Sequence, residues 1–392
     1  MTAVADRRAY SGPLLFSFGF RPFFLIAGAW PVAAVPLWVL AYLGVEPFAG
    51  TITRDWHVHE MLFGYLGGVM AGFLLTAVPN WTGRMPVIGA PLASLAGLWI
   101  AGRAAMLAAP QSPWTAIVDT AFLLVFAAVI WREVLTGRNW RNLPVCLLVS
   151  LLAAANIGVH LRTPYPDVAS GSERLALGVA SLMIALIGGR VTPSFTRNWL
   201  IQQRAATLPA TASRFDLAVL ISTGVAMAGW IVAPDQKAVG VALALAGAAN
   251  LVRLARWRAE TTLAEPLVWI LHAGYAWMGL ALVMLGGSIL ASDAVPRSAG
   301  IHALTVGAIG VMTVAMMTRA ILGHTGRALV AGRAGLAIYL LLNVGAVLRI
   351  AAAFWPADQA LLLGLSSAAW CGGFATFTAI YGPMLVGPRA DR

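Results

Sequence analysis

About twelve long apolar runs limit what this chain can fold into more than any other feature of its sequence. An α-helix needs about 20 consecutive, mainly apolar residues to cross the hydrocarbon core of a bilayer. The pattern therefore predicts an all-α, polytopic membrane helix bundle with about 12 transmembrane helices. The expected spans lie near 22–44, 56–80, 87–109, 114–135, 143–161, 173–193, 215–233, 237–257, 266–291, 301–322, 330–354 and 358–385.

The composition excludes a water-soluble protein. Charged residues make up only 10% of the chain and hydrophobic residues 60%, whereas a soluble domain uses about 25% charged residues to cover its surface. Most of the outer surface must therefore face lipid. The connections between the apolar runs are short, so we expect one integral membrane domain over residues 1–392 with no soluble domain attached.

The arginines outside the apolar runs predict the orientation of the chain. Most of them fall in alternate connections, such as Arg138 and Arg141 between the fourth and fifth runs, on the side shared with Arg7 and Arg8. Because cytoplasmic loops are enriched in Lys and Arg, we expect both termini in the cytoplasm. The first apolar run is too long for a cleavable signal peptide, so none is expected.

The net charge of +11 does not indicate a nucleic-acid partner, because the basic residues stand singly between apolar runs. The two cysteines, Cys146 and Cys371, lie in separate apolar stretches with no CxxC motif. They predict neither a disulfide framework nor a thiolate metal site. Membrane lipids are the surroundings that the charge pattern favours.

Ionisable side chains inside the apolar runs are the best guide to function, because such groups are costly at bilayer depth. The predicted orientation sorts them into two layers. The inner half of the membrane holds His272 and His324. The outer half collects four histidines, two carboxylates and two arginines: His57, His59, His160, His302, Glu60, Asp119, Arg103 and Arg349.

Helical geometry limits which of these side chains can meet. At about 100° per residue, His57 and Glu60 share one face of the second span, and His59 points nearly the opposite way. Only one of the two histidines can then face the bundle interior. On the same span the sequence places Gly64, Gly68 and Gly72 four residues apart, which favours close helix packing or, alternatively, a flat macrocycle lying against the helix.

Buried imidazoles converging in a helix bundle favour a metal or haem site. Neutral imidazole is a common ligand of haem iron and copper. Arg54, Arg103 and Arg349 are the candidates for pairing with haem propionates, and Met316 or Met317 suits Cu(I). A histidine at a helix end is also a common interfacial hydrogen-bonding group, and for His272 and His324 both interpretations stay open. The expected cofactors are haem, of b type, and copper, with Glu60 as candidate proton donor or as partner of a ligand.

Five segments of the sequence resemble the NnrS family of bacterial membrane proteins, and the likeness extends over nearly the whole chain. The segments are FGFRPFF from Phe18, WHVHEMLFGY from Trp56, GFLLTAVPNWTGR from Gly72, HALTVGAIGVMTVAMMTR from His302 and GHTGR from Gly323. The resemblance implies a polytopic protein of the bacterial inner membrane that contains haem and copper. It makes His57, His59 and His302 the leading ligand candidates, followed by His324.

The resemblance also implies a role in the response to nitric oxide. Our main hypothesis is a protein that binds or turns over nitric oxide, or a nitrosylated metal species, at a histidine-ligated site in the outer half of the bilayer. Turnover would make it an oxidoreductase acting on nitrogen oxides, and the sequence identifies no electron donor. The alternative is a transporter of a metal, haem or a small anion that uses the same buried histidines and arginines. A six-plus-six inverted repeat, frequent in transporters, is not evident.

Overall fold

The structure of the protein is a computed structural model that describes residues 10–48, 50 and 52–391. Within these residues every regular element is helical, and 12 segments are long and apolar enough to cross a membrane. The predicted all-α bundle with about 12 spans is confirmed. Arg7 and Arg8, which contributed to the predicted orientation, lie outside the described residues, and the orientation of the termini stays a prediction.

Nine of the 12 spans are continuous α-helices, and two of them directly follow a short 3-10 turn. Proline often begins a helix because its missing N–H needs no partner there, as at Pro113 and Pro266. The continuous helices are α2 (Phe20–Tyr42), α5 (Ala90–Ala108), α6 (Pro113–Thr136), α7 (Leu143–His160), α10 (Arg214–Val232), α11 (Lys237–Ala255), α12 (Pro266–Leu290), α15 (Gly332–Phe354) and α16 (Gln359–Val386).

Each of the other three spans is an α-helix interrupted by a π-helical segment. Single π segments inside α-helices are rare and often mark functional sites. The three composite spans are α3 (Arg54–His59), η2 (Glu60–Tyr65) and α4 (Leu66–Thr82); α8 (Pro166–Met183), η4 (Ile184–Gly188) and α9 (Gly189–Gln202); and α13 (Arg297–His302), η6 (Ala303–Gly310) and α14 (Val311–His324).

The helices group into two compact units, each with its own packed interior. The first comprises Met1–Ala176, Ala320–Ala328 and Phe374–Arg392, and the second comprises Leu177–Arg319 and Leu329–Gly373. The expectation of one integral membrane domain over the whole chain stays a prediction.

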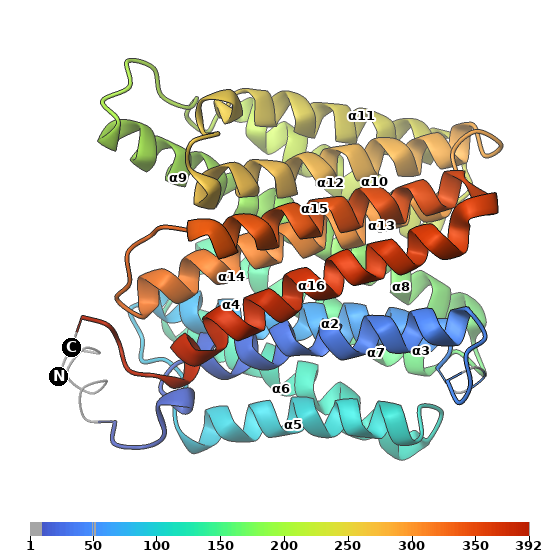
Figure 1. The fold of residues 1–392 in the computed structure, drawn as a ribbon, viewed down its shortest axis with the longest axis horizontal. Helices are drawn as coiled ribbons and strands as arrows, with labels where there is room; N and C mark the ends of the chain where they lie inside the picture. The colour runs from blue at the N-terminus through green and yellow to red at the C-terminus, as the bar shows by residue number, and fades with distance from the viewer. Residues whose placement is uncertain (1–9, 49, 51, 392) are drawn as a thin grey trace. The chain divides into compact units, whose positions relative to one another are not determined.

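In the first unit the composite span α3–η2–α4 is the central helix. Of its most apolar window, 83% is buried by protein, against 33% for α2. α2 and α6 pack along α4, and α2 runs beside it (Figure 1). A polar side chain on the central span is therefore enclosed by other helices and not by lipid.

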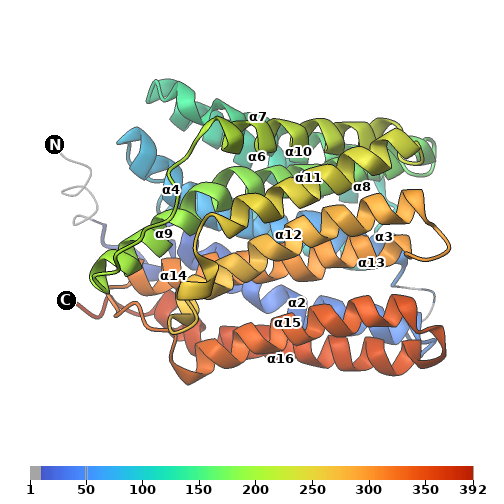
Figure 2. The same cartoon turned by 90° about the horizontal axis from the view of Figure 1, so that it is seen from above.

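In the second unit α11 and α12 form the closest helix pair, side by side in Figure 1. Glycines allow the backbones to approach: a Cβ placed on Gly247 of α11 would lie 2.6 Å from the carbonyl oxygen of Gly279 on α12. Small residues at such crossings are typical of membrane helix pairs. The other side of α12 packs against α13 and η6, as Figure 2 shows for α13.

Candidate metal centre

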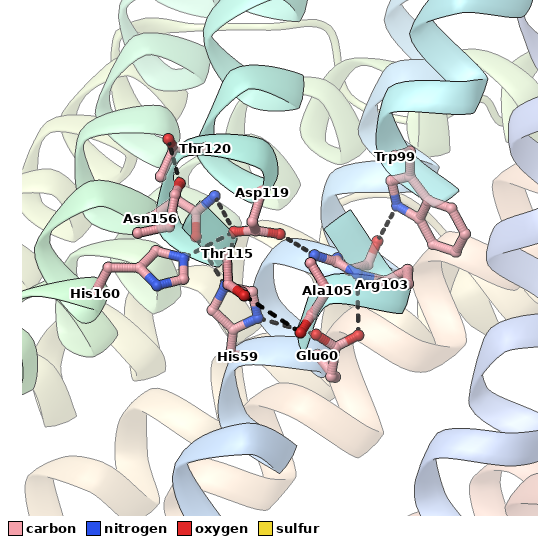
Figure 3. Close-up of polar contacts among 12 residues, drawn as sticks. His59, Glu60, Trp99, Arg103, Ala105, Thr115, Asp119, Thr120, Asn156 and His160 are labelled. Atoms are coloured by element: carbon pink, nitrogen blue, oxygen red, sulfur yellow. Dashed lines mark hydrogen bonds and ion pairs between the residues drawn. The ribbon is translucent and has the colours of Figure 1, made fainter. Parts of the chain in front are cut away.

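A cluster of buried polar side chains lies in the first unit, near one end of four neighbouring spans (Figure 3). It draws on the end of α3, the start of η2, and helices α5, α6 and α7. Its members are His59, Glu60, Arg103, Asp119, Asn156 and His160.

Local sequence signals fix the helix that carries His59 and Glu60. The hydroxyl oxygen of Thr53 accepts the backbone N–H of Trp56 at 3.1 Å and so caps the start of α3. Trp56, 2% exposed, anchors the first turn. The π segment begins immediately after His59, and the indole of Trp99 donates to the carbonyl oxygen of Gly64 within it at 2.9 Å. The distorted turn is thus held by a side chain from α5.

Asp119 is the centre of the cluster, and three side chains point toward its Oδ2 atom in Figure 3. His59 Nε2 and His160 Nε2 each lie 3.0 Å from Oδ2, and Asn156 Nδ2 donates to it at 2.9 Å. Asp119 and Asn156 are 2% and 1% exposed. A carboxylate this deeply buried needs several such partners to offset its lost hydration.

Arg103 balances the negative charge. Its Nη2 donates to the other oxygen of Asp119, Oδ1, and its Nε lies 3.1 Å from Glu60 Oε2. Glu60 is fully buried and Arg103 is 4% exposed. The guanidinium therefore turns Oδ1 away from the two imidazoles and leaves Oδ2 facing them.

His59 bridges the two carboxylates. Its Nδ1 lies 3.0 Å from Glu60 Oε1, and its Nε2 faces Asp119 and also Asn156 Oδ1, at 3.0 Å. A ligating histidine commonly donates its second N–H to a carboxylate, which fixes the ring and makes the ligating nitrogen more basic. Glu60 is that carboxylate here, because it contacts Nδ1. The other ring nitrogen, Nε2, is then available as a metal ligand beside Asp119 and His160.

The ligand atoms of His59, Asp119 and His160 lie within 4.8 Å of one another, and this group could hold a metal ion. Two imidazoles and one carboxylate suit Zn²⁺ and Cu²⁺, and with open positions they form the ligand set of non-haem Fe(II) centres. At metal–ligand distances of about 2.0–2.2 Å, an ion between these atoms would replace the direct contacts of the two Nε2 atoms with Oδ2.

The same residues do not fit haem. An iron between two axial imidazoles holds the nitrogens about 4 Å apart on opposite faces of a flat ring. Here the rings of His59 and His160 have centroids 5.1 Å apart at 62°, and Asp119 lies between their edges. The glycine stripe is filled as well, since a Cβ on Gly72 would lie 2.6 Å from Phe24 Cδ1. The macrocycle interpretation is therefore wrong for this stripe, and close helix packing holds.

The remaining predicted residues of the first unit lie in other surroundings. His57 stacks on Trp38, with centroids 5.2 Å apart at 14°. Arg54 pairs with Glu173 and Asp55 at the exposed end of α3. The ring of His324 stacks against Phe18 and Phe20, with centroids 5.7 and 5.3 Å away.

Three predicted residues belong to the second unit. His272 is 4% exposed, and its Nε2 lies 2.8 Å from Thr196 Oγ1. Nδ1 of His302 lies 2.7 Å from the carbonyl oxygen of Ser298. Arg349 is half-buried near the end of α15. Of the two methionines suited to Cu(I), Met317 is fully buried and Met316 is half-buried.

Sequence reasoning did not list two central members of the cluster as site residues. Asp119 was grouped only as a charge of the outer half, and Asn156 is the kind of residue that cross-links membrane helices by hydrogen bonds. The available signal for Asp119 is its position seven residues into a helix whose other charged residues, Arg132 and Glu133, lie near its far end. No local pattern relates it to His59, because the two are 60 residues apart.

The comparison with known proteins adds to this geometry. A search of curated proteins finds no match to the chain. The model of the NnrS protein family matches residues 14–389, a range that includes all six residues of the buried cluster. This multi-pass membrane protein belongs to the NnrS protein family.

Proposed function

We propose that this chain is a metalloprotein of the bacterial inner membrane that binds nitric oxide, or a nitrosylated metal species, at an ion held by His59, Asp119 and His160. The observation that carries the proposal is the convergence of these three donor atoms within 4.8 Å, in a cluster enclosed by helices. The nitric-oxide context is what the resemblance to the NnrS family implies, and membership of that family supports it.

The donor set supports a redox-active ion. Two histidines and one carboxylate occupy three positions of a metal that takes four to six ligands, so at least one position stays open for a small molecule. Iron(II) and copper both accept imidazole and carboxylate ligands and both bind nitric oxide. The gas is small, uncharged and soluble in lipid, so it can reach a buried ion between helices without a polar channel.

The surrounding residues position the donors. Glu60 holds the ring of His59 through Nδ1, and Arg103 holds Asp119 through Oδ1. Asn156 bridges His59 and Asp119. Glu60 and Arg103 meet their ligands on the side away from the converging atoms, whereas Asn156 contacts the converging atoms themselves. The ligands are thus held in place before the metal arrives. The charges of Glu60, Asp119 and Arg103 leave one net negative charge to attract a cation.

The proposal is tested on the purified full-length protein in detergent. Wild type and Asp119→Asn are loaded with iron(II) or copper, bound metal is measured by elemental analysis, and nitric oxide is added to follow the electron paramagnetic resonance spectrum. We expect about one ion per chain and a metal–nitrosyl signal in wild type, and loss of both in Asp119→Asn.

Asp216→Asn is the matched control. Asp216 is also buried and paired with an arginine, Arg253 at 2.9 Å, in the second unit. The Asp216→Asn variant should unfold more easily than wild type but keep the ion bound by His59, Asp119 and His160. Equal metal content and equal nitrosyl signal in wild type and Asp119→Asn would overturn the proposal. Metal-dependent uptake into proteoliposomes with no nitrosyl signal would support a transporter instead.

A further inference from the structure

Three residues other than glycine have a positive φ in the part of the chain that the structure describes, and all three are arginines. They are Arg138, Arg204 and Arg258, with φ angles of 49°, 54° and 64°. In this left-handed region the Cβ atom crowds the backbone, so glycine is usual there and asparagine or aspartate is the common substitute. Strained backbone of this kind is a reason to look for a function of the side chain.

Arg138 and Arg204 occupy the same place in the same helix-end motif. After α6, the N–H groups of Arg138 and of the next residue bond to the carbonyl oxygens three and five residues before them, at 3.1 Å each. After α9, Arg204 and the residue that follows it make the same two bonds, at 3.0 Å each. This pair of bonds defines the Schellman motif, whose left-handed residue is usually glycine.

The same motif contains glycine at two other helix ends of this chain. Gly44 follows α2 with a φ of 78°, and Gly326 follows α14 with a φ of 70°. Both make backbone bonds at the same two spacings. The motif therefore does not need a side chain at this position. A basic residue that interacts with the helix dipole could also stand in the last turn, where it would cause no backbone strain.

The side chains of Arg138 and Arg204 are available to a partner outside the protein. Both are exposed, and within the described residues neither guanidinium has a hydrogen bond or an ion pair. Arg258 differs, because its Nε donates to a carboxylate oxygen of Glu260 at 2.7 Å. Two of the three strained positions thus present an unpaired cation, and the third cation is paired within the chain.

The surroundings of Arg138 are typical of the interface between membrane and water. Trp140, two residues later, is 58% exposed, and Trp81 at the end of α4 is 37% exposed. The side chain of Asn139 donates to the carbonyl oxygen of Trp81, which holds this connection against the end of α4. Exposed tryptophans at the ends of spans lie at the level of the lipid headgroups, so Arg138 is expected at that level too.

The surroundings of Arg204, in the second unit, have a similar character. The last two turns of α9 carry a second exposed arginine, Arg197, and the side chain of Ile201, which is 53% exposed. Basic side chains next to exposed apolar ones suit the boundary between headgroups and acyl chains. There the apolar part lies against lipid, and the charged end reaches the polar headgroups.

The phosphate of an anionic phospholipid is the partner that fits these two positions. A guanidinium presents N–H groups in a planar fork, and two of them can donate to two oxygens of one phosphate. Lipids with a net negative charge attract basic residues near the membrane surface, and each arginine adds to this attraction. Arg141, also exposed and close to Arg138 in the chain, adds positive charge to the same connection.

We propose that Arg138 and Arg204 each bind the phosphate of an anionic phospholipid headgroup at the end of its helix. Binding of the lipid offsets the backbone strain that glycine would avoid. The inference does not depend on the ion proposed at His59.

The test uses the purified full-length protein in detergent, with phosphatidylglycerol as probe and phosphatidylcholine as the zwitterionic comparison. Native mass spectrometry measures the affinity for each lipid, and thermal unfolding is followed without added lipid. Arg138→Gly and Arg204→Gly remove the charge and the strain together, so each should raise the unfolding temperature. Each variant should also weaken the binding of one phosphatidylglycerol molecule about five-fold, and the double variant should weaken that of two.

Arg258→Gly is the matched control. It removes the same charge from the same backbone conformation, but from a side chain that is paired within the protein. The pair with Glu260 is exposed and contributes little to stability. Arg258→Gly should therefore also raise the unfolding temperature, and it should bind phosphatidylglycerol as tightly as wild type does.

A second substitution keeps the proposal testable if the glycine variants fold poorly. Asparagine tolerates a positive φ, so Arg138→Asn should also lose about five-fold in affinity for phosphatidylglycerol. Wild-type affinity in the variants of Arg138 and Arg204, or an equal loss in Arg258→Gly, would overturn the inference. Equally tight binding of phosphatidylcholine by wild type would overturn it too. A lower unfolding temperature with unchanged lipid affinity would assign both arginines to the helix ends and exclude the lipid role.

Discussion

His59 Nε2 lies 3.0 Å from Asp119 Oδ2, although the two residues come from spans 60 residues apart and both are almost fully buried. His160, from a third span, approaches the same oxygen at the same distance. Side chains from three helices thus converge at one carboxylate oxygen, in a protein with few charged residues. A buried arrangement of this kind is costly unless it is balanced, which is why we assign it a function.

The partner of His59 should control metal affinity. Glu60→Ala removes the acceptor of Nδ1, so the ring loses its orientation, and we expect metal to bind about 10–100-fold more weakly. Glu60→Gln keeps an amide oxygen that can accept the same hydrogen, and it should lose less. Competition titrations with a chelator measure both affinities, and equal losses in the two variants would contradict the role of Glu60 as an acceptor.

Arg103 should be far more important for stability than the exposed Arg54. Arg103→Met leaves Asp119 and Glu60 buried without their cation, which typically costs about 3–5 kcal/mol. The Arg54 side chain is 57% exposed where it pairs with Glu173, so Arg54→Met should cost at most about 1 kcal/mol. Thermal unfolding in detergent compares the two variants. Similar losses of stability in Arg103→Met and Arg54→Met would mean that the buried ion pairs of Arg103 do not stabilise the cluster.

Gly64 leaves room for the guanidinium of Arg103. A Cβ on Gly64 would lie 2.7 Å from Arg103 Nη1 and 3.0 Å from Glu60 Oε2. We expect Gly64→Ala to displace the arginine and weaken metal binding. The control is Gly97→Ala on α5, where an added Cβ meets nothing within 4 Å, and metal binding should be unchanged there. Wild-type metal affinity in Gly64→Ala would show that the position of Arg103 is unimportant.

The α11–α12 crossing should affect stability but not the metal centre. Gly247→Ala forces a methyl group against the backbone of α12 and should cost about 1–3 kcal/mol, as overpacking does. Because this crossing belongs to the second unit, the ion at His59 should stay bound in the folded protein. Metal content after purification and the unfolding temperature together check the prediction, and loss of the ion from folded protein would argue against it.

The spans were predictable because a helix in lipid needs a long apolar run, and such runs are visible locally. Span α5 was expected near 87–109 and extends over Ala90–Ala108. This signal lies in the sequence of each span alone and does not depend on which helices pack beside it. The π segments gave no such local signal, and the first of them is contacted from another helix, where the Trp99 indole donates to the Gly64 carbonyl oxygen.

The site was predicted only in part for the same reason. Ionisable side chains are costly inside a membrane, and this rule predicted a site that includes His59, Glu60, Arg103 and His160. All four lie in the cluster. Periodicity grouped Glu60 with His57, yet the Glu60 carboxylate contacts His59, its neighbour in the chain. The two side chains are long enough to bend toward each other. Assigning residues to faces of a helix by periodicity does not take this into account. The pairing with Asp119 depends on how three helices pack.

The most direct test of the central claim is the X-ray absorption spectrum of the metal-loaded protein, compared with that of His160→Gln. The account predicts a shell of nitrogen and oxygen atoms at about 2.0–2.2 Å, with outer-shell scattering from two imidazoles in wild type and from one in the variant. A shell containing sulfur, or an imidazole contribution unchanged by His160→Gln, would contradict a metal held by His59, Asp119 and His160.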